Sequence, residues 1–264
     1  MKKTCLILAA CLLTFVLAEA RTVKKVYDID DFTGISASHA FQVTLEKAKT
    51  FSVEIEISEE FLPYLVVMNR NGLLELGFAT LPLKLRQKER NKVAKAVVRM
   101  PVLTAVYLSG ASSLTVQDPF SNAMNKFSLT LKGGSSVRDL TMKAPETEIE
   151  LSGASQAVLR LQSSKVDVEL SGASRVELSG KTTELEASLS GASRLAGASF
   201  EAEKIELEAK GASNADVRPL RSLEVKLSGA SRCRYYGNAE KLKVDAAKIK
   251  GASSLTHQEE SIQK

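Results

Sequence analysis

The 264-residue sequence contains no tryptophan and only two histidines, and aromatic residues make up 5% of it. His39 and His257 stand near opposite ends of the chain, so we expect neither a histidine-containing metal site nor a Ser-His catalytic pair. The low aromatic content favours a thin core filled by Leu, Val, Ile and Ala. The sequence therefore predicts no catalytic residues, no metal and no cofactor.

Cysteine is also scarce, and two of the three cysteines, Cys5 and Cys11, fall in a segment typical of a signal peptide. In residues 1–20, two lysines precede an apolar run and an Ala-Glu-Ala motif, so cleavage before Arg21 is expected. Cys233 would then be the sole cysteine, which excludes an intramolecular disulfide. We expect Cys233 to be a buried, inert thiol, because it occupies an apolar position of the repeat described below.

The signal predicts export to the periplasm, the cell surface or the medium. A lipid anchor at Cys11 is the alternative, but the apolar stretch before this residue is short and an apolar run continues after it. No later apolar stretch is long enough to span a bilayer, so we expect no transmembrane segment after cleavage.

Glycine, in contrast, follows a regular spacing. The motif Leu-Ser-Gly-Ala-Ser and its variants recur at intervals of about 20 residues, a period typical of a solenoid. The glycines of this structural repeat are Gly110, Gly133, Gly153, Gly172, Gly191, Gly211, Gly229 and Gly251.

Around each glycine the apolar residues alternate with polar ones. Apolar side chains stand two and four positions before the glycine and four positions after it, which is the period of a β-strand with one buried face. Stacked parallel coils would bury these faces in continuous columns. The sequence therefore predicts an all-β fold, a parallel β-helix of about 20-residue coils. Whether the serine two positions after each glycine faces inward stays open.

The predicted organisation has four parts. Residues 1–20 form the signal peptide, and residues 21–100 form N-terminal coils and an irregular cap. Residues 101–256 form the repeated coils, and residues 257–264 form a polar tail. Within the N-terminal part, Ile35 to Val43 resembles a degenerate first coil with His39 in the glycine position.

Two groups of basic residues form the candidate binding surface. The first lies in a segment that we expect to be a solvated loop leading into an edge strand over residues 93–102, and the second directly follows the repeat serines. No aromatic residue interrupts the first group, which argues against specific nucleic-acid binding. The two groups are Lys84, Arg86, Lys88, Arg90 and Lys92, and Arg175, Arg194 and Arg232.

Three stretches, GISASHAFQVTLE, VVRMPVLTAVYLSGASSLTV and the repeated LSGAS coils, carry a resemblance to a known family. The sequence resembles the bacterial family of putative autotransporter adhesins with a head GIN domain, over nearly all of residues 23–255. This resemblance implies a right-handed parallel β-helix, export in Gram-negative bacteria and an adhesin-like role. It implies no catalytic residues.

Two functions follow from these observations. The first is a noncatalytic exported scaffold that binds a surface glycan, a matrix protein or an envelope component, and an oligomer is compatible with it. The alternative is a polysaccharide lyase or hydrolase acting on acidic glycans, which needs clustered carboxylates. Glu150, Glu169 and Glu208 share a repeat position, but Ser188 interrupts them. We therefore expect a binding protein rather than an enzyme.

Overall fold

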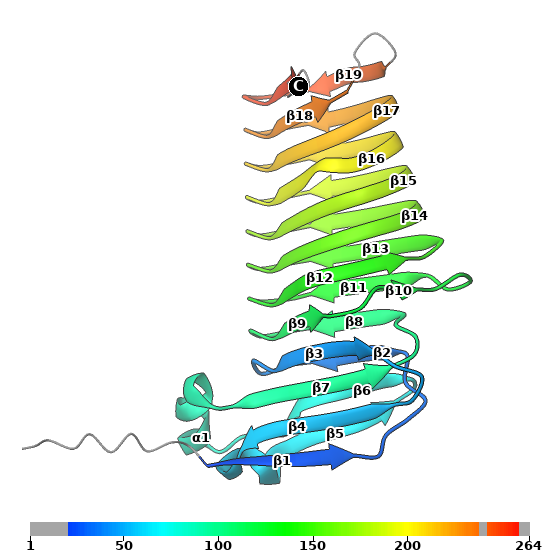
Figure 1. The fold of residues 1–264 in the computed structure, drawn as a ribbon. Coiled ribbons are helices and arrows are strands. Elements are labelled where there is room, and N and C mark those ends of the chain that lie inside the picture. Colours follow the sequence, from blue (N-terminus) through cyan, green and yellow to red (C-terminus); the bar gives the residue numbers. More distant parts are fainter. Residues whose placement is uncertain (1–20, 238–241, 259–264) are drawn as a thin grey trace, which may run out of the picture.

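The computed structural model describes residues 21–237 and 242–258. The expected signal peptide, the Cys11 anchor position and the last six residues of the polar tail lie outside this part. The described chain is almost all β and consists of stacked parallel coils of about 20 residues, which confirms the predicted β-solenoid (Figure 1). The coils form an elongated rod, with the N-terminal strands at one end and β19 at the other (Figure 1).

Each coil contributes to two walls that meet at the glycine, here called the glycine corner. The strands before the corner pair in parallel to form the first wall, and the strands after it pair in parallel to form the second. The first wall contains β2 (Gly34–Ala37), β6 (Leu73–Phe78), β8 (Ala105–Leu108), β11 (Phe127–Leu131), β13 (Glu146–Leu151) and β19 (Lys243–Ile249). The second contains β3 (Gln42–Lys47), β7 (Ala94–Met100), β9 (Ser113–Val116), β10 (Phe120–Ser121), β12 (Ser136–Lys143), β18 (Arg232–Tyr236) and β20 (Ser254–Gln258).

Four long strands pass from the second wall into the first around the edge opposite the glycine corner. Their first halves pair within the second wall and their last halves within the first. They are β14 (Gln156–Leu170), β15 (Arg175–Leu189), β16 (Arg194–Ala209) and β17 (Asn214–Leu227). This edge is called the groove edge below.

The N-terminal end of the rod differs from the coils because several of its strands run antiparallel. β1 (Thr22–Tyr27) pairs with β4 (Ser52–Ser58), β4 pairs with β7, and β5 (Leu65–Arg70) pairs with β6. Three short helical segments accompany them, namely η1 (Glu59–Tyr64), α1 (Leu83–Lys88) and η2 (Glu89–Asn91).

The expectation for residues 84–102 was wrong in two respects. The basic segment is helical rather than a loop, because α1 and η2 occupy it. The strand that follows, β7, is not an edge strand, since β3 and β4 pair with its two sides.

The predicted apolar columns are buried. Leu108, Leu170 and Leu227 in the position before the corner are each 1–2% exposed, and Cys233 after the corner is fully buried. Only towards the C-terminal end of the described chain does this burial weaken, where Ile249 is 36% exposed. Alternation of apolar and polar residues therefore selects the inner face of the walls throughout the regular coils.

The glycine corner requires glycine for two reasons. The corner glycines have positive φ angles, for example 75° at Gly191, a backbone region that L-residues avoid. A Cβ at Gly191 would also stand 2.6 Å from the carbonyl oxygen of Gly172 in the coil below. The first coil has His39 in this position with a φ of 59°, and its register with Gly110 is as predicted, because Ala37 pairs with Leu108 and Gln42 with Ser113.

The serine column faces inward, which settles the orientation that the sequence left open. The serines from Ser112 to Ser231 are at most 1% exposed. Most of them close the corner by donating a hydrogen bond to the carbonyl three residues earlier, as Ser193 Oγ does to Ser190 O at 2.9 Å. Two serines differ: Ser174 Oγ donates to Leu151 O at 3.3 Å, and the buried Oγ of Ser112 has no hydrogen-bond partner among the described residues. The hydroxyls thus serve the backbone of the turn.

Candidate functional site

The first basic group lies at the N-terminal end of the rod, where most of its side chains have local partners. Lys88 Nζ lies 2.6 Å from Glu60 Oε2, and Arg86 Nε donates to Leu81 O. Lys92 Nζ lies 5.3 Å from the ring centre of Phe78, and burial there lowers the pKa of Lys92. Lys84 and Arg90 are exposed without such a contact in the described structure. This group mainly fastens α1 and η2 to the cap.

The second basic group lies on the second wall. The expected column is present, because Arg175 pairs with Arg194, and Asn214 separates Arg194 from Arg232. Arg194 is not free, since its Nη2 lies 3.0 Å from Asp216 Oδ2. The candidate surface is therefore not one surface but two, at the cap and in the later coils (Figure 1).

Asp216 is an ion-pair centre that the sequence did not reveal. Its carboxylate is 8% exposed and also accepts two bonds from Arg234, at 2.6 Å to Nε and 3.0 Å to Nη2. This bidentate contact raises the pKa of Arg234. Because Asp216 connects two arginines in neighbouring coils, this cluster stabilises the wall rather than offering a free cationic surface.

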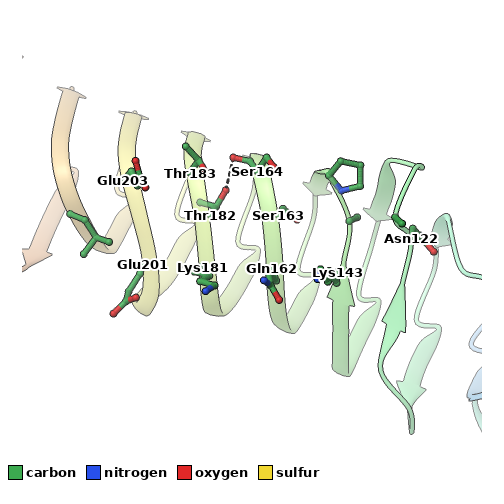
Figure 2. A pocket seen from close by; sticks show the side chains of 14 residues that line it. Asn122, Lys143, Gln162, Ser163, Ser164, Lys181, Thr182, Thr183, Glu201 and Glu203 are labelled. Atoms are coloured by element: carbon green, nitrogen blue, oxygen red, sulfur yellow. Dashed lines mark hydrogen bonds between the residues drawn. The ribbon is translucent and has the colours of Figure 1, made fainter.

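A groove along the groove edge is the better candidate site. Figure 2 shows its side chains arranged strand after strand along the rod, so that each coil contributes its own members. The hollow has a volume of about 540 Å³. Its polar lining residues are Asn122, Lys143, Gln162, Ser163, Ser164, Lys181, Thr182, Thr183, Glu201 and Glu203, and its apolar ones are Ala123, Ala144, Pro145 and Leu220.

A second hollow of about 570 Å³ adjoins the first on the outer face of the second wall. The two share Lys143, Gln162, Lys181 and Glu201, which lie in one line across β12, β14, β15 and β16 (Figure 2). The second hollow also has Arg160 and the residues around Phe120 in its lining. Together the hollows form a continuous surface that carries both hydrogen-bonding and apolar groups, here called the edge groove.

Asn122 lies at one end of the edge groove and has a buried acceptor without a partner among the described residues. The residue is 3% exposed, its backbone N–H donates to Lys143 O, and its Nδ2 donates to Leu103 O. These contacts orient the side chain and leave Oδ1 buried without a partner among the described residues. A buried acceptor in this state costs stability, so the excursion that carries Asn122 is held by its two donated bonds and not by the side-chain oxygen.

The structure also reveals an acidic row on the first wall. Strand pairing places six carboxylates side by side in successive coils, a longer run than the column of Glu150, Glu169 and Glu208 that Ser188 interrupts. These residues stand five positions before the corner glycine in most coils, a signal that inspection of that position would have found. They are Glu148, Asp167, Glu186, Glu206, Glu224 and Asp245.

Basic residues neutralise part of the acidic row. Lys165 Nζ lies 2.7 Å from Glu186 and 3.5 Å from Asp167, and Lys126 Nζ lies 2.8 Å from Glu148.

Within residues 21–237 and 242–258, no group of His, Cys, Asp or Glu has the arrangement needed to hold a metal ion. The same part of the chain contains no helix long and apolar enough to cross a membrane.

Comparison with known proteins places this arrangement in a family. Residues 31–239 match the family described as "Putative auto-transporter adhesin, head GIN domain". The chain belongs to this family. The resemblance noted in the sequence is thereby confirmed, and the match extends from the cap into the repeated coils of this GIN domain protein, up to the coil before β19.

Several solved structures share the fold at low sequence identity. A putative adhesin from Parabacteroides distasonis is 16% identical, with a TM-score of 0.80 over 92% of this chain and 98% of that chain. A putative lipid binding protein from the same organism is 16% identical, with a TM-score of 0.77 over 90% and 96%. A putative adhesin from Parabacteroides merdae is 18% identical, with a TM-score of 0.74 over 90% and 96%. No curated protein matches the sequence.

Proposed function

We propose that this GIN domain protein is an exported, noncatalytic scaffold that binds a surface glycan in its edge groove. The observation that carries the proposal is the hollow of about 540 Å³ at the groove edge, which hydroxyl, amide and charged side chains from successive coils line (Figure 2). Sugar hydroxyls can both donate and accept hydrogen bonds, so a glycan complements such a lining better than an apolar ligand does. The adhesin description of the family agrees with this role.

The shape of the edge groove supports an extended ligand. Its lining residues come from successive coils between β10 and β17, so the groove follows the axis of the rod (Figure 2). A polymer laid along this axis would meet similar groups in each coil, as the concave surfaces of other repeat proteins meet extended partners. A chain of sugars fits this geometry better than a single compact molecule.

Two substitutions in the same coil test the proposal. Thr183 is exposed and lines the groove, whereas Ala192 is exposed at the glycine corner on the other edge. Thr183→Trp fills the groove and is expected to abolish glycan binding, while Ala192→Trp retains it. Binding of the exported protein is measured first on a glycan array and then by titration calorimetry with the glycans that score highest.

Three results would contradict the proposal. Equal binding by Thr183→Trp and the unsubstituted protein would show that the ligand binds outside the edge groove. Absence of binding to any glycan would exclude glycans as the ligand. Release of new reducing ends or of unsaturated sugars from acidic polysaccharides would show turnover and favour the lyase or hydrolase alternative.

A further inference from the structure

The second hollow contains a row of outward side chains in strand register. Ser121 pairs with Lys143, Lys143 with Gln162, Gln162 with Lys181, and Lys181 with Glu201. All five residues line the hollow and are exposed. This row, Ser121 to Glu201, is called the groove row. Because its members are in register, its chemical pattern repeats with the spacing of the coils.

The members of the groove row are available to a ligand. The side chains of Lys143, Gln162, Lys181 and Glu201 form no hydrogen bond or ion pair with any other residue that the structure describes. Lys165 and Lys88, by contrast, lie within 2.7 Å of a carboxylate. Within the described structure, the two lysines of the groove row therefore carry positive charges without an ion pair inside a hollow, and such charges attract anionic groups.

The spacing of the two lysines defines the pattern of the ligand. Neighbouring coils are ~4.8 Å apart, so Lys143 and Lys181, two coils apart, are separated by ~10 Å along the rod. A pyranose ring lengthens an extended glycan by about the distance that one coil lengthens the rod. A glycan along the groove row would thus place one sugar at each coil, with lysines at every second sugar and the neutral Gln162 between them.

The surroundings of the groove row support the same ligand. Arg160, which pairs with Thr141 two residues before Lys143, also lines the hollow, as does Lys47, whose Nζ lies 5.8 Å from the ring centre of Phe120. These residues increase the positive charge around the first lysine. Glu201 follows Lys181 in the next coil and would repel an acidic sugar at that position. An acidic sugar is therefore favoured at Lys143 and Lys181 and disfavoured one coil further on.

We infer that the groove row recognises a glycan in which acidic and neutral sugars alternate, with the carboxylates or sulfates of every second sugar at Lys143 and Lys181. This inference rests on the proposed function, because it names the class of glycan that the edge groove binds. Gln162 hydrogen-bonds the neutral sugar between them through its amide.

Three oligosaccharides of equal length test the inference by titration calorimetry. Hyaluronan carries a carboxylate on every second sugar, polygalacturonate on every sugar, and a cello-oligosaccharide carries none. We expect hyaluronan to bind at least about tenfold more tightly than the other two, a difference of ~1.4 kcal/mol, and its affinity to fall as salt rises.

A double variant with a charge-matched control identifies the residues. Lys143→Gln with Lys181→Gln is expected to weaken hyaluronan binding about tenfold or more, ~1.4 kcal/mol. Lys132→Gln with Lys250→Gln removes the same charge from exposed lysines at the glycine corner and is expected to leave binding within about twofold, since screening weakens distant charges.

The outcomes separate this inference from the proposed function. Equal affinity for hyaluronan and polygalacturonate, or equal losses in the two double variants, would overturn the alternating pattern. Binding of the neutral oligosaccharide alone would overturn the inference and leave the proposed function standing. Binding of no glycan would overturn both, and if vesicles of phosphatidylcholine with anionic phosphatidylglycerol then bind through Lys143 and Lys181, the edge groove is a lipid-surface site.

Discussion

The carbonyl oxygen of Gly172 occupies the space in which a side chain of Gly191 would begin. A Cβ on Gly191 would stand 2.6 Å from this oxygen, and the same relationship recurs along most of the glycine corner. The oxygen accepts a hydrogen bond from Ala192 N at 2.8 Å, which fixes its position. The corner is therefore tight because the backbones of neighbouring coils bond directly at that point.

Because of this contact, a glycine-to-alanine substitution at the glycine corner should lower the free energy of unfolding by different amounts in different coils. Gly110 also has a positive φ, but a Cβ there would lie 3.4 Å from the nearest atom, His39 N. Gly110→Ala should lower the free energy of unfolding by only ~1–2 kcal/mol, which is the cost of a left-handed backbone conformation for alanine. Gly191→Ala should cost a further ~1–3 kcal/mol, because backbone must shift. Urea denaturation measures both, and equal losses of unfolding free energy would show that the close approach is unimportant.

The serine column permits a similar comparison. Ser193→Ala removes the 2.9 Å bond to Ser190 O and should destabilise the fold by ~1 kcal/mol. Ser112→Ala removes a buried hydroxyl without a partner and should be neutral or stabilising. Thermal unfolding of the two variants checks this expectation. A larger loss at Ser112 than at Ser193 would contradict it.

Cys233 should be unreactive while the protein is folded. Burial raises the pKa of its thiol to about 12, so almost no thiolate forms at pH 8. We expect negligible reaction with a thiol reagent until urea unfolds the chain. Since the folded pKa exceeds the unfolded value, this group contributes stability that is lost as pH rises above about 9, and Cys233→Ala should remove that part of the alkaline loss. Rapid labelling of the folded protein would contradict the burial.

Removing the charge of Asp167 or of Glu208, two carboxylates of the first wall, should change the stability of the fold at pH 7 in opposite directions. Partial burial, with a contribution from Glu186, raises the pKa of Asp167, so its charged form is disfavoured in the fold. Asp167→Asn should therefore raise stability slightly at pH 7, by less than about 0.5 kcal/mol. The gain should shrink as pH falls towards the ordinary carboxyl pKa of about 4 and vanish below it.

Glu208 is the matched control for Asp167. Its bond with Lys210 lowers the pKa of its carboxyl, so the charged form stabilises the fold above the ordinary pKa. Glu208→Gln should lower stability at pH 7, and this loss should disappear as pH falls through the lowered pKa. Thermal unfolding from pH 3 to pH 7 checks both variants. Changes of the same sign at pH 7 would contradict these assignments.

The sequence predicted the regular coils well because each corner repeats the same backbone constraint. A left-handed residue once per coil sets the strand register, so even His39 could be aligned with Gly110. The inward orientation of the serine side chains was harder to predict, because an alternation of period two does not show whether the chain bends at the corner. The structure shows that the parity continues, with Ser155 and Leu151 both buried.

The groove edge could not be predicted in the same way. Members of the groove row do not keep a constant distance from the preceding glycine, because the pairing shifts between Val137 and Leu140 and again between Glu177 and Ser179. The excursion that carries Asn122 belongs to a single coil and gives no periodic signal. The basic residues chosen from the sequence either formed a run, as Lys84 to Lys92 do, or shared a repeat position, as Arg175 and Arg194 do. Lys143 and Lys181 do neither.

The distance between the charges of the groove row depends on the number of coils between them. Each coil supplies a single member, so loss of the coil that carries Gln162 would bring Lys143 and Lys181 into adjacent rungs. Duplication of that coil would separate them by one more sugar length. Gain or loss of a whole coil would thus change the distance between the two lysines along the rod. Related proteins with different numbers of coils could then bind polymers with a different spacing of charges, while the sequence of the glycine corners stays the same.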